Sequence, residues 1–330
     1  MYQHVSAATG TDMTFSVYVP EHDGGAKLPV VWYLSGLTCT HANVTENGEV
    51  RRLCAALSLI FVAPDTSPHG EGVADGAAGA YDFGLGAVFL IVHPTYERFE
   101  AELDLVCEYR PSIVITALGS PRRVLDRIHG YGGSVFSDVV TPEQARKAAA
   151  AGADGLILVA SGAGGHTGHY SPFALVEEVR SFWDGPLILG GAIGSARAIG
   201  AALDLGADFA YMGTHFIAAP ESLVVDDNRE MLVRASMSDI VTTPAVTGVA
   251  SNWIRESLDR AGFTPEILEV KKKIDFSNLH GDAKAWKNIW GAGHSVGTTR
   301  SIRTVATIVD ELVDDFREAN FGRSISRWIS

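Results

Sequence analysis

The chain has 330 residues, of which 46% are apolar and 20% charged; this composition is typical of a well-packed globular protein with one large α/β domain or two smaller ones. Its formal net charge of −13 argues against a nucleic-acid partner, because such partners need clustered Lys and Arg. The three cysteines form no C-x-x-C pair and the N-terminus lacks a signal segment, so we expect a cytoplasmic protein without a disulfide framework, a metal site or a membrane span.

The first 87 residues contain a predicted parallel βαβ unit, with strands at 30–34 and 59–63 and a helix at 47–58. This segment resembles the start of S-formylglutathione hydrolases, which are α/β-hydrolases, through the stretches MTFSVYVP, LPVVWYLSGLTCTHANVTENGE, LIFVAPDTSP and YDFGLGA. The resemblance implies that Ser35–Cys39 help to form an oxyanion hole. It ends after Ala87, before the nucleophile, acid and histidine of that family, so residues 1–87 are predicted to be a hydrolase-like fragment without a triad.

A repeating strand–helix pattern occupies residues 88–330. VFLIV (88–92) is a predicted strand, and further short apolar runs, typical of buried parallel strands, begin at Ile113, Ser134, Leu156, Leu187 and Phe209. These starts are 21, 22, 31 and 22 residues apart. The near-constant period favours a (β/α)8, TIM-type barrel over a doubly wound sheet, with its first strands replaced by the hydrolase fragment.

The segments between these runs carry helix signals. Thr141 and Gln144 form a capping box around Pro142, and Gly152 follows the predicted helix end. Ser120-Pro121 and Ser171-Pro172 open two further helices in the same way. The segments AAGADGLIL (150–158) and DLGADFAYM (204–212) repeat a Gly-Ala-Asp between a helix and a strand, as expected for repeated βα units.

The one long interval contains SGAGGHTGHY (161–170), which follows a strand and therefore lies on the face where barrels keep their chemistry. Its glycines allow a close approach of backbone to ligand, and His166 can exchange a proton near neutral pH. A flexible loop with a solvent-facing histidine is the structural alternative. Gly190-Gly191 and Gly213-Thr214 end the next two strands, and with the helix start near Ser195 they predict a phosphate cradle.

Residues 89–318 resemble the nitronate monooxygenase family, formerly called 2-nitropropane dioxygenases. The matching stretches are ITALGSP, VFSDVVTPEQARKAAAAGADGLIL, AGGHTG, SPFALVEEVR, LILGGAIGSARAIGAALDLGADFAYMGTHFIAAPES and AKAWKNIWGAGHSVG. The resemblance implies an FMN-binding (β/α)8 barrel that oxidises alkyl nitronates with O2 to a carbonyl compound and nitrite, with His166 as the catalytic histidine. It also implies FMN contacts from Gly164, Gly190, Gly191, Tyr211, Met212, Gly213 and Thr214.

The chain departs from that family in its first strands. The Ala-Pro-Met turn and the Gly-Leu-Gly segment of the family are not visible, Tyr211 stands where many members have glutamine, and Val88 stands about where an FMN-contacting asparagine is expected. The hydrolase fragment could replace the lost strands, with residues 30–63 parallel to 88–92 in one closed sheet and the flavin facing Ser35–Cys39 and Val88. It could equally leave an open edge and half a flavin site. Weakened FMN binding and impaired activity are expected from the first arrangement.

The segment Gly293–Gly297 (GHSVG) matches the G-x-S-x-G nucleophile elbow of α/β-hydrolases. An elbow requires a buried strand before the serine and a histidine later in the chain. Ser295 instead follows AKAWKNIWGA, and no histidine follows His294. Ser295 is therefore not predicted to be a nucleophile. The sequence leaves open two alternatives to a nitronate monooxygenase: an esterase or S-formylglutathione hydrolase, and a non-catalytic fusion fragment.

Overall fold

The computed structural model describes residues 2–5, 12–18, 20, 30–32, 60–64, 87–222, 224–269 and 288–318. Two sequence-based expectations, the helix at 47–58 and the turn at Ser35–Cys39, lie outside these residues. In the described part of the chain, no helix combines the length and the apolar character that a membrane span requires.

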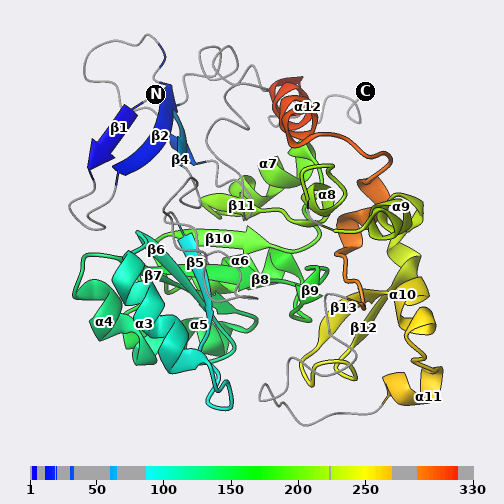
Figure 1. Cartoon of the computed structure of the whole chain (residues 1–330), viewed down its shortest axis with the longest axis horizontal. Helices are drawn as coiled ribbons and strands as arrows, with labels where there is room; N and C mark the ends of the chain where they lie inside the picture. Colours follow the sequence, from blue (N-terminus) through cyan, green and yellow to red (C-terminus); the bar gives the residue numbers. More distant parts are fainter. Residues whose placement is uncertain are drawn as a thin grey trace, which may run out of the picture.

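A parallel six-stranded sheet forms the centre of the molecule (Figure 1). Its spatial order is β11-β10-β8-β7-β6-β5, and every neighbouring pair is parallel. The strands match the predicted apolar runs: β5 (Ala87–Ile91), β6 (Ile113–Ala117), β7 (Ser134–Val139), β8 (Gly155–Val159), β10 (Leu187–Gly190) and β11 (Phe209–Tyr211). Between them run α3 (Phe99–Tyr109), the 3-10 turn η1 (Pro121–Arg123), α4 (Leu125–His129), α5 (Pro142–Ala151), α6 (Pro172–Arg180) and α7 (Ala196–Asp204).

These helices share one face of the sheet. Leu90 and Val135 belong to a buried cluster with Leu103 of α3 and Ile128 of α4. A second cluster joins β7, β8 and β10 to α5, α6 and α7. A doubly wound sheet carries helices on both faces, whereas a (β/α)8 barrel carries them on the outside only. The sheet is thus an arc of a barrel, and the face opposite the helices is its inner wall.

The predicted helix signals are in place. Thr141 Oγ1 accepts the Gln144 N–H at 3.1 Å, and Gly152 ends α5 with φ of 103°, a conformation that glycine adopts without strain. The Gly-Ala-Asp repeat has a structural role at both of its positions. Asp154 Oδ2 accepts the Val135 N–H at 2.7 Å, and Asp208 Oδ2 accepts the Leu187 N–H at 2.8 Å. Each aspartate therefore ties the start of its own strand to the start of the preceding one.

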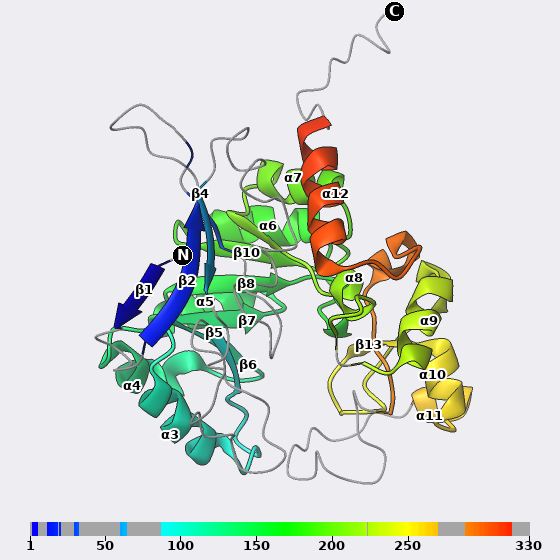
Figure 2. The ribbon, with the colours of Figure 1, turned by 45° about the horizontal axis from the view of Figure 1, so that its top comes forward.

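The remaining elements cap the carboxyl ends of the strands. A small antiparallel sheet contains β9 (Gly165–His166), β12 (Ile240–Thr243) and β13 (Ser251–Ile254). The C-terminal α12 (Val305–Glu318) packs over α7 and α8 (Thr214–Ile217), as Figure 2 shows. The other described elements are α9 (Asp226–Arg234), η2 (Met237–Asp239), α10 (Arg255–Arg260), α11 (Pro265–Leu268) and η3 (His294–Thr298).

The N-terminal strands form a separate four-stranded sheet. Its order is β1-β2-β4-β3, with β1 (Tyr2–Val5), β2 (Asp12–Tyr18), β3 (Val30–Trp32) and β4 (Ile60–Pro64). β3 and β4 are parallel, as the predicted βαβ unit requires. The expectation of one closed sheet with β5 is wrong, because in the described part of the chain β3 and β4 pair only within this sheet, and neither pairs with β5 or β11.

The barrel arc is consequently open within the described residues, where β5 and β11 have one neighbour each. Inner-wall side chains at these two strands reach solvent: Phe89 is 48% exposed, Phe209 45% and Tyr211 52%. In a closed barrel such positions fill the interior in layers. The structure thus retains the outer core of a barrel and leaves part of its inner wall uncovered.

We expect Asp208→Ala to lower the free energy of unfolding by about 1–2 kcal/mol, because it removes the acceptor for the Leu187 N–H and the partner of Arg180 Nη2 at 2.6 Å. Denaturant unfolding measures this change. Asp204→Ala, at an exposed position of α7, is the matched control and should change stability little. Equal stabilities of the two variants would contradict the role assigned to the repeat.

Candidate active site

A cavity of about 1340 Å³ lies at the carboxyl ends of the six strands. Parallel strands bring these ends to one rim, where barrel enzymes keep their active sites. All the predicted site residues line this cavity: Gly164, His166, Gly190, Gly191, Tyr211, Met212, Gly213 and Thr214. Segments separated by some fifty residues along the chain therefore meet as the sequence predicted.

The His166 loop is held by strand pairing. β9 pairs with β13, with His166 opposite Ser251, and Asn252 Nδ2 donates to the Ala163 carbonyl at 2.7 Å. The interpretation as a flexible loop with a solvent-facing histidine is therefore wrong. His166 is partly buried, and burial lowers its pKa to about 4, which keeps the imidazole neutral near pH 7 and able to accept a proton.

The turn after β10 brings backbone close to the cavity. Gly191 has φ of +125°, and a Cβ there would lie 2.9 Å from the Ala160 carbonyl oxygen, so only glycine fits without movement. Ala192 follows with φ of 56°. A Cβ built on Gly213, in contrast, meets nothing within 4 Å. Gly213 thus faces open space in the cavity, as a cradle for a phosphate group requires.

The helix start near Ser195 is found, but it does not line the cavity. Ser195 caps α7 by accepting the Ala198 N–H at 3.2 Å. The preceding turn is covered by η3, since a Cβ on Gly194 would lie 2.5 Å from the Cβ of Ser295. The predicted contribution of this helix N-terminus to the cradle is therefore corrected: the two glycine turns line the cavity, and the start of α7 supports them from behind.

A buried histidine fixes the second glycine turn. His215 Nε2 lies 2.6 Å from the Gly194 carbonyl oxygen, and His215 Nδ1 lies 3.1 Å from Thr299 Oγ1. The neighbouring Thr214 Oγ1 accepts the Gly293 N–H at 3.0 Å. The Thr214 side chain therefore has a structural partner within the protein.

The wall of the cavity at β5 differs from the expectation. Val88 is 6% exposed and belongs to the outer core with α3, so it does not face a flavin. Its neighbours Phe89 and Ile91 line the cavity instead. Side chains alternate across a strand, and the polar contact expected near Val88 is thus replaced by an apolar wall.

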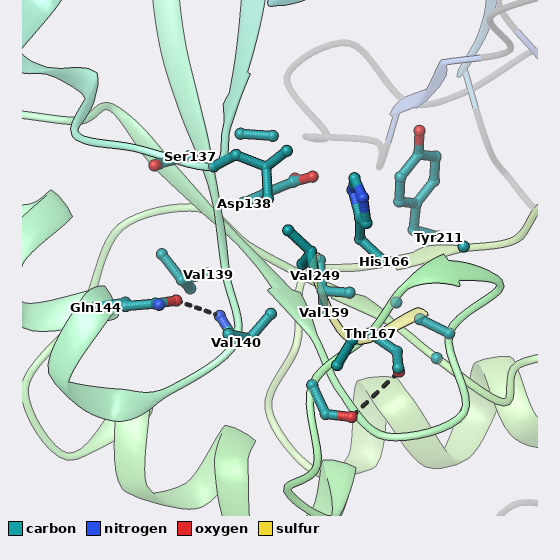
Figure 3. Close-up of a pocket in the computed structure, with 18 of the residues that line it drawn as sticks. Ser137, Asp138, Val139, Val140, Gln144, Val159, His166, Thr167, Tyr211 and Val249 are labelled. Carbon is teal, nitrogen blue, oxygen red and sulfur yellow. Dashed lines mark hydrogen bonds between the residues drawn. The ribbon is translucent and has the colours of Figure 1, made fainter. Parts of the chain in front are cut away.

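Asp138 is a cavity residue that the sequence reasoning missed. It lies on the inner wall of β7, opposite Ile157 of β8, and Figure 3 shows Asp138 and His166 projecting into the same cavity, with Tyr211 beside the imidazole. Burial raises the pKa of Asp138 to about 7. The signal was present in SVFSDVV (134–140), where a charged residue occupies an inward position of a buried strand.

Tyr211 lies at the end of β11, against the Gly190 turn. A Cβ on Gly190 would lie 3.5 Å from the Tyr211 Cβ. Although about half of the Tyr211 surface is exposed, partial desolvation of the phenol, and to a lesser degree the Asp138 carboxylate, raise its pKa above the ordinary value. The phenol is therefore neutral near pH 7, and its ring gives the cavity an aromatic face on the side opposite Asp138.

Ser295 lies in η3, at the border of the cavity. The residues before it, 291–293, have no regular secondary structure, so the strand that a nucleophile elbow needs is missing there. No histidine of the described chain makes a hydrogen bond to Ser295 Oγ. The arrangement agrees with the sequence prediction that Ser295 has no base to activate it.

The lining of the cavity fits a flavin that carries a phosphate group. The Gly190-Gly191 and Gly213-Thr214 turns offer backbone and open space at one end, and the aromatic rings of Phe89 and Tyr211 stand at the inner wall. Pockets with a largely apolar lining and a few polar groups are typical of cofactor sites. Among the described residues, no group of three His, Cys, Asp or Glu side chains could hold a metal ion.

Two protein families match this chain. A family model described as nitronate monooxygenase matches residues 76–315, and one described as putative esterase matches residues 6–101. The two matches overlap at 76–101, around the predicted junction near residue 87, and the domain limits 1–87 and 88–330 stay predictions. S-formylglutathione hydrolase of Paracoccus denitrificans (strain Pd 1222) is 47% identical over 91 residues, which are 28% of this chain. The chain spans only 32% of the length of that relative.

Two solved structures resemble the barrel part. FabK from Thermotoga maritima is 27% identical with a TM-score of 0.59, over 70% of this chain and 76% of that one. Nitroalkane oxidase from Streptomyces ansochromogenes is 25% identical with a TM-score of 0.59, over 68% of this chain and 70% of that one. Together with the family matches, these similarities confirm the barrel fold and the joining of segments from two families.

We expect Ser295→Ala to leave any ester hydrolysis by this protein unchanged, because neither a strand nor a base supports the serine. The same reasoning predicts that a fluorophosphonate probe does not label Ser295. Mass spectrometry of the probe-treated protein, beside a known serine hydrolase as positive control, measures this. Stoichiometric labelling of Ser295 would overturn the assignment.

Proposed function

Because the chain belongs to the nitronate monooxygenase family, we propose that it is an FMN-dependent oxidoreductase that oxidises alkyl nitronates, or the nitroalkanes from which they form, with O2 to a carbonyl compound and nitrite. Family membership and the likeness to nitroalkane oxidase make flavin-dependent oxidation the general class of chemistry. The observation that carries the proposal is the meeting of His166 and the two glycine turns in one cavity.

The proposed FMN site uses the carboxyl ends of three strands. The main chain of Gly190-Gly191 and of Gly213-Thr214 would hold the phosphate, with Gly164 approaching from the His166 loop and Tyr211 and Met212 beside the ring. When bound, FMN would supply the electron transfer from substrate to O2, while the protein supplies position and proton transfer. The positive φ values of Gly191 and Ala192 shape this turn before any ligand arrives.

His166 has the proposed role of proton acceptor. Its imidazole is neutral because burial lowers its pKa to about 4, and it faces the cavity from a strand whose position is fixed by β13. A neutral nitroalkane must lose a proton from its carbon before oxidation, whereas a nitronate has already lost it. The imidazole would therefore take that proton from the first substrate and only orient the second.

The open side of the barrel arc is expected to weaken FMN binding. The inner wall at Phe89 and Tyr211 is about half exposed, so it can shield a flavin ring only in part. We propose that FMN is anchored at its phosphate end and bound more weakly than in a complete barrel, with reduced activity. Each lost hydrogen bond to a buried polar ring costs about 1–3 kcal/mol, or roughly ten- to a hundredfold in affinity.

The same opening favours a second candidate, a non-catalytic fusion fragment that folds without cofactor, since β5 and β11 each lack a second neighbour among the described residues. Reconstitution with FMN separates the two. The proposal expects the purified protein, after incubation with FMN and removal of free ligand, to retain the visible spectrum of an oxidised flavin and to release nitrite from a nitronate. A colourless protein after this treatment would favour the fragment.

We expect Gly213→Ala to weaken FMN binding by about ten- to a hundredfold, because the added methyl group points into the space assigned to the phosphate. Its backbone φ of −131° accepts an alanine, so thermal stability should not change. Quenching of FMN fluorescence measures the affinity. Gly297→Ala is the matched control, since a Cβ there makes only ordinary contacts at 3.7 Å; equal affinities of both variants would place the phosphate elsewhere.

We expect His166→Asn to retain the FMN that the parent retains and to lose about 10²–10⁴-fold in turnover of neutral nitroalkanes, the usual contribution of a general base. Nitronates should suffer less because they are already deprotonated. The control is His129→Asn, which changes an exposed histidine that does not line the cavity. Nitrite release from matched nitroalkane and nitronate pairs measures the effect, and equal losses for both substrates would contradict the role.

A further inference from the structure

The inner wall of the barrel arc contains a single acidic residue among the strands that the structure describes. The registers of the six described strands place the following residues on this wall: Phe89, Ile91, Ile113, Ile115, Ala117, Ser134, Phe136, Asp138, Gly155, Ile157, Val159, Ile188, Gly190, Phe209 and Tyr211. Asp138 is the only one that can ionise near neutral pH. A carboxyl group in an apolar wall is costly unless it has partners, so its presence needs an explanation that packing does not give.

The described residues leave one oxygen of this carboxyl group unsatisfied. Asp138 Oδ1 is closed off from solvent and has no hydrogen-bond partner in the described part of the chain. The groups that face it are His166 from β9 and Tyr211 from β11, while its strand neighbours β6 and β8 present no titratable side chain on this wall. Arg122, Lys147, His93 and His169 also line the cavity, from the turns after β5, β6 and β8 and from α5.

The removal of water from around Asp138 decides whether its carboxyl group is protonated. Burial raises the pKa of Asp138 to about 7, and burial keeps His166 neutral above about pH 4. Between these limits the cavity contains a neutral acid opposite a neutral base. A protonated carboxyl has an O–H donor that an ionised one lacks, and an apolar site that keeps an acid neutral lets it donate to a developing oxyanion.

We propose that Asp138 is an anion-recognising residue of the cavity: as a carboxylic acid it donates a hydrogen bond to an oxygen of a small planar oxyanion, such as a nitronate, that lies between it and His166. Proton uptake and anion binding are then coupled. Once Asp138 ionises, the donor is lost and like charges repel, so the anion binds only the protonated form.

The inference deepens the proposed function and rests on it for the identity of the natural anion. When a nitroalkane loses its carbon-bound proton to the His166 imidazole, the electron pair of that C–H bond moves onto the nitro group and its oxygens gain the negative charge. Asp138 keeps its own proton and stabilises those oxygens by its hydrogen bond. The two residues would thus act on opposite ends of one substrate.

Nitrate, a planar oxyanion that is not oxidised, tests this without turnover. Titration calorimetry of the full-length, FMN-treated protein should show that the dissociation constant for nitrate is constant below about pH 7 and rises about tenfold per pH unit above it. In buffers of different ionisation enthalpy, binding at about pH 8 should take up close to one proton per nitrate. Arg122 and Lys147, which stay charged at this pH, would give no such uptake if they simply attracted nitrate.

Two substitutions of Asp138 test whether this residue causes the pH dependence of nitrate binding. Asp138→Asn keeps a donor but cannot ionise, so nitrate binding should persist and lose its pH dependence; Asp138→Leu, without a donor, should weaken binding at every pH. Asp126→Asn, an exposed position in α4, is the matched control and should behave as the parent. Unchanged pH dependence of nitrate binding in Asp138→Asn would overturn the inference. So would a loss of nitroalkane turnover in that variant while nitrate binding stays intact, because this result would make Asp138 a base.

The unfolding midpoint checks the environment of Asp138 independently of any ligand. Its folded pKa lies above its ordinary value, so the parent should lose stability relative to Asp138→Asn as the pH rises from about 4 to about 7. Absence of this trend would show that the carboxyl is not desolvated and would also overturn the inference. If nitrite release fails but proton-linked nitrate binding is found, the proposed reaction is wrong and the anion site stands.

Discussion

The parallel register of six strands is the constraint on which the site depends. Because every strand of the arc points the same way, the chain passes the same rim each time it leaves a strand, and each departure adds a segment to one cavity. The glycine turns after β10 and β11, the loop after β8 and the end of β7 have no proximity in sequence. They share a cavity because helices occupy only the outer face and return the chain to the opposite end of the sheet.

Much of this could be predicted from local chemistry. Apolar runs, a capping Thr141 and a terminating Gly152 act over a few residues, so their signals are readable in sequence and the elements appear where expected. The meeting of the glycine turns followed from the barrel period alone. Predictions that needed the direction of one side chain were less secure. Val88 was expected in the cavity but lies in the outer core. A shift of one residue along a strand moves a side chain to the opposite face.

Other features could not be predicted because they depend on pairing across long separations. The His166 loop has the composition of a mobile segment, and the strand that pairs with it, β13, lies about eighty residues later. The placement of the hydrolase-like strands also depends on partners. β4 satisfies both of its edges within its own sheet, so the local βαβ signal was right and its assignment to the barrel was wrong.

The division of the outer core into two clusters has a consequence for the joining of the two segments. One cluster joins β5, β6 and β7 to α3 and α4, and the other joins β7, β8 and β10 to α5, α6 and α7, so each is assembled from consecutive stretches of chain. Among the described residues, both clusters lie wholly on the carboxyl side of the boundary before β5, so neither includes a side chain of the N-terminal sheet. The outer core is therefore self-contained with respect to the N-terminal segment, whereas the inner wall, which needs a neighbouring strand at both ends of the arc, is the part left incomplete.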